Sequence, residues 1–149
     1  MSTVPDTSFE GRTYSPGQPR TVSAAKIAEF ARATSAASPL HTDAEAARAA
    51  GHDDVIAPPT FLVSIAQSEE ARYIDDPAAG VDFSRVVHGE ESFVLARPVV
   101  AGDVLTPTLT VEKIRLVGGN AMIFTRVDMT DARDEHVATV RSSIVVRGE

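Results

Sequence analysis

The spacing of hydrophobic positions divides the first third of the chain into an extended start and two short helices. Prolines and glycines interrupt residues 1–20, which favours an extended lead-in arm over a helix. Apolar residues recur at helical spacing across 23–34, and Ser23 is placed to act as the N-cap. The run Thr42–Glu45 has capping-box spacing, and alanine-rich residues up to Gly51 follow it, which indicates a second helix over 43–50.

A third helix and a set of strands follow. Pro58 and Pro59 break the chain, and the apolar run that opens at Thr60 predicts a largely buried helix. Beyond Gly80 the pattern changes to short β-type stretches. The four expected strands span residues 86–95, 104–116, 121–130 and 135–146. Helices followed by an antiparallel meander predict an α+β class in which the apolar helix packs on the sheet.

Length and charge limit the domain number, the cellular compartment and the class of ligand that we expect. The chain has 149 residues, so we expect a single domain over 1–149. No stretch is long and apolar enough for a membrane span, and the start lacks a signal-peptide centre, which predicts a cytoplasmic protein without membrane contact. A formal charge of −7 without any Lys/Arg run argues against nucleic acid. Such acidity would also repel coenzyme A or an acidic carrier protein unless cations gather locally, and Arg72, Arg85 and Arg97 are the candidates.

Several reaction classes lack the residues that they need. There is no cysteine, which excludes disulfides, thiolate metal sites and a Cys nucleophile. The serine elbow of hydrolases, the Gly-rich phosphate loop, the dinucleotide fingerprint and His-Glu-x-x-His are all missing. His52 with Asp53 and Asp54 is interpreted as a solvated loop, since no further ligand stands at metal spacing. We therefore expect neither a metal nor a cofactor.

The run Thr34–Asp43 resembles the motif of the MaoC-like (R)-specific hydratases and dehydratases. That motif reads approximately Thr-Gly-Asp-x-Asn-Pro-x-His-x-Asp, and an Ala-rich helix ending in Gly follows it, as it does here. Further signatures of the family are matched by Val87-His88-Gly89, Arg97-Pro98-Val99 and Ala101-Gly102-Asp103. The resemblance covers nearly the whole chain. It implies a hotdog fold, in which an antiparallel sheet wraps around a central apolar helix, and activity on 3-hydroxyacyl or enoyl thioesters.

The family's acid–base pair is an Asp and a His, and only the His is retained. Ala36 stands at the Asp position and His41 at the His position. A methyl group cannot accept a proton, and loss of a general acid or base costs about 10²–10⁴ in rate. His41 is therefore the catalytic candidate, and a leftover hydrogen-bonded residue is the alternative. Asp43 is better explained by a favourable interaction with the helix dipole than as a substitute carboxylate.

Other residues are candidates for contact with substrate. Backbone amides at a helix N-terminus suit the thioester oxygen, which gains negative charge as the adjacent proton leaves. Because the two preceding prolines lack N–H groups, Thr60 and Phe61 are the expected donors, and capping of the buried helix is the alternative role for Thr60. In the family the strand that contains His88 and Gly89 borders the acyl channel, so both are expected to bind substrate. A solvent-facing position is the alternative for His88.

Three functions stay open. The first is a dehydratase or hydratase relative acting on 3-hydroxyacyl or enoyl groups carried by coenzyme A or a carrier protein. The second is a non-catalytic acyl-binding subunit of a heterodimeric dehydratase, since Pro58-Pro59-Thr60-Phe61 is typical of the subgroup that includes such subunits. The third is a recruited secondary-metabolism enzyme performing another elimination, isomerisation or cyclisation. In each case a lone hotdog sheet leaves an open edge, which predicts a homodimer or a heterodimer with another hotdog subunit.

Overall fold

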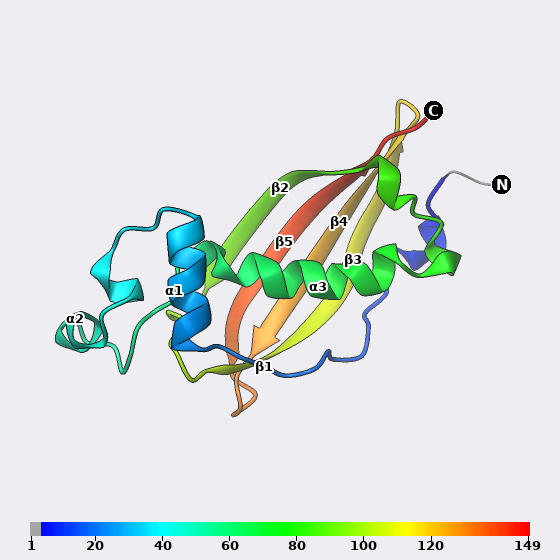
Figure 1. Ribbon diagram of the computed structural model, residues 1–149. Coiled ribbons are helices and arrows are strands. Elements are labelled where there is room, and N and C mark those ends of the chain that lie inside the picture. The colour runs from blue at the N-terminus through cyan, green and yellow to red at the C-terminus, as the bar shows by residue number, and fades with distance from the viewer. Residues whose placement is uncertain (1–3) are drawn as a thin grey trace.

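The computed structural model describes residues 4–149, in which one helix lies across a curled antiparallel sheet (Figure 1). The helices are α1 (Ala24–Ala33), α2 (Ala44–Ala49) and α3 (Val63–Ile74). The strands are β1 (Arg20–Thr21), β2 (Val86–Leu95), β3 (Val104–Val117), β4 (Asn120–Thr130) and β5 (His136–Val146). This arrangement confirms the predicted α+β class and is the one that a hotdog fold requires.

The core lies between α3 and one face of the sheet. Alternate residues of β4 from Ala121 to Met129 are buried, as expected when one face of a strand is covered. From α3 and the turn before it, Leu62, Ala66 and Tyr73 are fully buried at helical spacing. Among residues 4–149, no helix is long and apolar enough to cross a membrane.

The predicted meander is correct for three strands and wrong for the fourth. The sheet order is β1-β3-β4-β5-β2, so β2 pairs with β5 and not with β3, the next strand in sequence. Residues 96–103 carry the chain from β2, at one edge of the sheet, to β3, which lies beside the short β1 at the other side. Hydrogen bonds from Ala57 N–H to Val99 O (2.8 Å) and from Ala101 N–H to Val55 O (2.9 Å) hold this crossing against the segment before α3. The tertiary contacts of the connection therefore decide the strand order.

The lead-in arm packs against the sheet. Met1–Thr3 of the predicted arm lie outside the described residues, and the rest contains a short 3₁₀ turn, η1 (Thr7–Phe9), before β1 begins at Arg20. Backbone N–H groups of Gly11 and Tyr14 donate to Val111 O and Leu109 O at 2.8 and 2.9 Å. The arm therefore runs along the outer edge of β3.

The predicted helices form with local caps. Ser23 caps α1 as expected, accepting a hydrogen bond from Lys26 N–H at 3.1 Å. The cap of α2 is Asp43, which accepts from Glu45 N–H and Ala46 N–H at 3.0 and 3.2 Å. Thr42, the position that the capping-box spacing suggests, is not the cap. A carboxylate beside free amides at a helix start is stabilised by the helix dipole, which confirms the structural interpretation of Asp43.

Candidate functional site

His41 is held in a defined orientation at the end of a short 3₁₀ turn, η2 (Pro39–His41). The half-buried ring approaches the Ile56 carbonyl, with Nδ1 2.7 Å from the oxygen. A carbonyl oxygen only accepts hydrogen bonds, so Nδ1 must carry the hydrogen and donate it. In the neutral ring Nε2 is therefore unprotonated and can accept a proton. This is the tautomer that a general base needs.

No carboxylate accompanies His41. Ala36 lies just after α1, and its N–H donates to Ala31 O at 2.8 Å, so its backbone is part of the helix end. Among residues 4–149, no Asp or Glu lies within ion-pair distance of His41. The described residues therefore place no acid at ion-pair distance from His41 to replace the missing Asp.

Thr60 and Phe61 lie in a 3₁₀ turn, η3 (Pro59–Leu62), so the helix expected to open at Thr60 starts as a tighter turn and α3 follows at Val63. The N–H of Phe61 donates to Pro58 O at 2.9 Å, whereas the N–H of Thr60 has no partner among the described residues. Leu62 is the N-cap of α3, which excludes the capping role for Thr60. Phe61 is buried, with its ring edge-on to Phe30 at 5.6 Å between centroids.

His88 and Gly89 lie early in β2, at a break in its register with β5. The His88 Nε2 is 3.8 Å from the Glu70 Oε2, so the imidazole faces α3 while part of it stays exposed. A Cβ at Gly89 would lie 2.7 Å from the Ser143 Oγ, so a larger residue there would require that hydroxyl to move. Glu70 follows Thr60 by ten residues, which is roughly 15 Å along a helix. The predicted substrate-binding residues therefore form two groups. Thr60 and Phe61 lie just before α3, whereas His88 and Gly89 lie on β2, where His88 faces Glu70 of α3.

A buried polar cluster of Glu70, Glu91, Ser142 and Thr125 accompanies His88, and sequence reasoning missed it. The Ser142 Oγ lies 2.6 Å from the Glu70 Oε1 and 2.8 Å from the Glu91 Oε2. Glu70 is only 1% exposed. Three buried oxygens of the cluster have no hydrogen-bond partner in the described chain: Glu70 Oε2, Glu91 Oε1 and Thr125 Oγ1.

The two carboxyl groups beside Ser142 compete for one hydrogen. A hydroxyl has a single hydrogen and can donate it to only one carboxyl group at a time. Burial raises the pKa of Glu70, with the hydrogen bond from Ser142 opposing that effect and the charge of Glu91 adding to it. Glu70 therefore binds a proton more readily than an exposed glutamate does.

A sequence signal for this cluster was available. Glu69 and Glu70 stand three and four residues after the buried Ala66, on the stripe that also contains Tyr73. This helical spacing places both glutamates on the covered side of α3. Glu69 differs from its neighbour because Arg72 pairs with it at 2.9 Å, whereas Glu70 has no arginine or lysine partner in the described chain and contacts the Ser142 hydroxyl and the more distant His88 imidazole.

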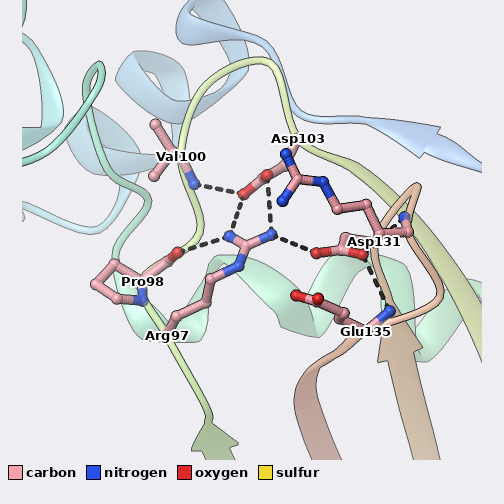
Figure 2. Close-up of polar contacts among 7 residues, drawn as sticks. Arg97, Pro98, Val100, Asp103, Asp131 and Glu135 are labelled. Atoms are coloured by element: carbon pink, nitrogen blue, oxygen red, sulfur yellow. Dashed lines mark hydrogen bonds and ion pairs between the residues drawn. The ribbon is translucent and has the colours of Figure 1, made fainter.

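The segment 97–103 forms a structural clamp (Figure 2). The guanidinium of Arg97 holds Asp103 with two contacts of 2.8 and 3.1 Å and reaches Asp131 at 3.3 Å. Asp103 also accepts from Val100 N–H, and Asp131 accepts from Glu135 N–H. These bonds tie the crossing connection to the turn between β4 and β5.

The three arginines suggested as a local cation patch do not gather. Arg85 lies before β2 and Arg97 after it, while Arg72 is on α3. Each pairs with carboxylates of the chain: Arg72 with Glu69, Arg85 with Asp82 and Glu149, and Arg97 with Asp103 and Asp131. The interpretation as a shared anion-binding patch is therefore wrong.

Comparisons with known proteins agree with this architecture. A family model described as the FAS1-like dehydratase domain region matches residues 8–140. UPF0336 proteins from Clavibacter michiganensis subsp. michiganensis and Streptomyces coelicolor are each 49% identical to the chain, with 95% of both sequences covered in each case.

Two solved structures are similar to the chain over most of its length. A MaoC-like dehydratase has a TM-score of 0.87 at 32% identity, with 94% of this chain covered but only 42% of that longer chain. The HadBC (3R-hydroxyacyl-ACP dehydratase) complex from Mycobacterium tuberculosis has a TM-score of 0.81 at 26% identity, covering 92% of this chain and 96% of that one.

Proposed function

Because the chain belongs to the FAS1-like dehydratase domain family and has the MaoC-like hotdog fold, we propose that it is a subunit acting in the dehydration or hydration of acyl thioesters. Its substrates are 3-hydroxyacyl or enoyl groups on coenzyme A or a carrier protein. His41 is the general base, and the Thr60 amide is the available donor to the thioester oxygen.

The orientation of His41 carries this proposal. Its 2.7 Å hydrogen bond to the Ile56 carbonyl leaves Nε2 ready to take the proton beside the thioester carbonyl. As the C3–oxygen bond breaks, the departing hydroxide must gain a proton to leave as water. The proton taken by Nε2 is one source, and a carboxylic acid would be the other.

The missing acid favours a second candidate function. Ala36 offers no proton, and no carboxylate of the described chain pairs with His41. A hotdog subunit without its own pair can still bind the acyl group while a different subunit supplies the Asp and the His. The similarity to one chain of the HadBC complex supports a hotdog partner of this kind.

The experiment is the hydration of a medium-chain enoyl-coenzyme A by the purified protein, followed by loss of the enoyl absorbance. We expect slow turnover that falls about 10²–10⁴-fold in His41→Ala. Ala36→Asp, which restores the family's acid, should raise turnover by about tenfold or more.

The controls separate the two candidates. His52→Ala changes a loop histidine remote from the motif and should leave turnover unchanged. No turnover by the wild type, together with saturable binding of a 3-hydroxyacyl-coenzyme A in calorimetry, would establish the acyl-binding subunit instead. Neither turnover nor binding would contradict both functions.

A further inference from the structure

The orientation of His41 depends on Ile56, which holds two neighbouring residues at once. The Ile56 carbonyl lies 2.7 Å from the His41 Nδ1, and the Ile56 N–H donates to the Leu40 carbonyl at 3.0 Å. Ile56 lies in the connection between α2 and η3, outside the helices and the strands of the sheet. Regular secondary structure therefore does not fix this carbonyl, and its position depends on what the connection bonds to.

A β-bridge ties this connection to the crossing segment 97–103. Ile56 pairs with Val100 in antiparallel fashion, and the flanking residues close the bridge with hydrogen bonds of 2.8 and 2.9 Å. In a pair of this kind the N–H and C=O groups of the two opposing residues point away from each other. Those of Ile56 can therefore hold Leu40 and His41, and those of Val100 can bond on the opposite side.

Asp103 occupies that opposite side (Figure 2). Its Oδ2 accepts from the Val100 N–H at 2.8 Å, and its own N–H donates to the Val100 carbonyl at 3.0 Å. Arg97 donates to the same Oδ2 at 2.8 Å, to the Asp103 Oδ1 at 3.1 Å and to the Pro98 carbonyl at 3.0 Å. Because a bidentate pair has one preferred geometry, the guanidinium restricts how the carboxylate can turn beneath Val100.

These contacts form one continuous path from the clamp to the imidazole. It runs from Arg97 through Asp103 to Val100, and then across the bridge to Ile56 and His41. Loss of the guanidinium frees the Asp103 carboxylate and, with it, the Val100 backbone. The Ile56 carbonyl can then move relative to the imidazole, and beyond hydrogen-bond reach it no longer selects the tautomer that has its hydrogen on Nδ1.

We infer that Arg97 and Asp103 are positioning residues that act on His41 through this bridge. They hold the imidazole in the tautomer whose Nε2 accepts a proton. The inference rests on the proposed function, in which His41 is the general base, and it gives the clamp a role in that reaction. Misplacement of a reacting group by about 1 Å can cost on the order of 10²-fold in rate, so a contact remote from the substrate can affect catalysis.

The test compares Arg97→Met with Arg126→Met in the full-length chain. Arg126 is a matched control because its guanidinium also bonds two carboxylates, those of Glu112 and Asp128. The two arginine side chains are similarly exposed, at 36% for Arg97 and 33% for Arg126. Arg126 lies on β4 and bonds no residue of the path. Arg97→Lys replaces the Met variant if that variant fails to fold, because lysine keeps the charge but not the planar fork.

The tautomer of His41 is measured by the side-chain ¹⁵N chemical shifts of the four histidines, with His41→Ala assigning the signal. We expect a hydrogen on Nδ1 in the wild type and in Arg126→Met. In Arg97→Met we expect a mixture of both tautomers, since no fixed acceptor then selects one, and Arg97→Lys should show a smaller change of the same kind. Turnover of enoyl-coenzyme A should fall about tenfold to a hundredfold in kcat in Arg97→Met, with KM unchanged.

An unchanged His41 tautomer in the Arg97 variants would overturn the inference. An equal change in Arg126→Met would also overturn it, because the effect would then reflect a general loosening of the fold. A changed tautomer with the kcat of the wild type would contradict the role in catalysis. The tautomer is measured without substrate, so an inactive wild type contradicts the proposed catalysis alone, and the tautomer still decides whether the clamp positions His41.

Discussion

The two polar clusters of the molecule differ in how completely they are satisfied. In the clamp, Arg97 bonds two carboxylates, and backbone N–H groups bond the same carboxylates (Figure 2). In the cluster beneath β2, Ser142 has one proton for two carboxyl groups, and three oxygens lack donors. A satisfied cluster stabilises the single chain, whereas an unsatisfied one leaves acceptors open to water, an ion or a group from outside the chain.

The two clusters also differ in whether their residues match the sequence signatures of the family. The segment 97–103 resembles a family signature, and its polar side chains fix the crossing from β2 to β3. Glu70 and Ser142 belong to no signature, yet they leave the unmatched hydrogen-bonding capacity. Resemblance to the family therefore identified residues of the clamp but not those of the cluster beneath β2.

The largest effect is expected from Ser142→Ala. Its hydroxyl connects two carboxyl groups, and without it both are buried without a donor, which should lower the free energy of unfolding by about 2 kcal/mol. Urea denaturation measures the loss. Ser143→Ala, at the next residue on the opposite face, makes no side-chain hydrogen bond in the described chain and is the control. Equal losses would show that the bridge contributes nothing specific.

Arg97→Met should lower the free energy of unfolding by less than Ser142→Ala does, since the clamp is partly exposed to solvent. The variant leaves Asp103 and Asp131 without their cation, and we expect a loss of about 1 kcal/mol in the same urea assay. Arg115→Met removes an exposed arginine without an ion pair in the described chain and should change little. A clamp variant as stable as this control would contradict the assigned role.

The smallest effect is expected from Glu70→Gln, which should raise the free energy of unfolding by an amount that depends on pH. The pKa of Glu70 is raised above 4.5, so between that value and its folded pKa the folded state binds more protons than the unfolded state. Stability from this group therefore falls as pH rises through that window. Glu70→Gln removes the titration and should make the chain more stable at pH 8 by up to about 1 kcal/mol.

Urea midpoints measured across pH check this prediction. The wild type should lose stability relative to the Gln variant as pH increases above about 4.5. Glu45→Gln, at an exposed helix position, is the control. Parallel curves for the wild type and Glu70→Gln would show that folding does not raise the pKa of Glu70.

Local signals predicted the elements well and their pairing less well. Ser23, Gly51 and the Gly118-Gly119 turn mark boundaries through backbone chemistry that acts within a few residues. The position of β2 beside β5 depends on a crossing held by contacts between residues about 40 apart, such as Ala57 with Val99. No short window of sequence contains such information.

In the candidate site, too, local sequence signals found contiguous motifs but not contacts between distant residues. His41 was found because its motif is contiguous, and its bond to Ile56 required only the neighbouring loop. The cluster of Glu70, Glu91 and Ser142 joins α3, β2 and β5, and each residue alone resembles an ordinary surface position. Helical spacing could have placed Glu70 on the buried side, but its partners come from strands that only the fold brings together.

The arm along β3 limits how many molecules can join. Gly11, Tyr14 and Gly17 donate hydrogen bonds to β3 from outside, and this end of the sheet offers no long free strand. Within residues 4–149, the β2 end alone leaves a long strand unpaired on one side. Edge-to-edge growth through this sheet therefore stops after two subunits, and the packed arm protects the chain against fibre formation.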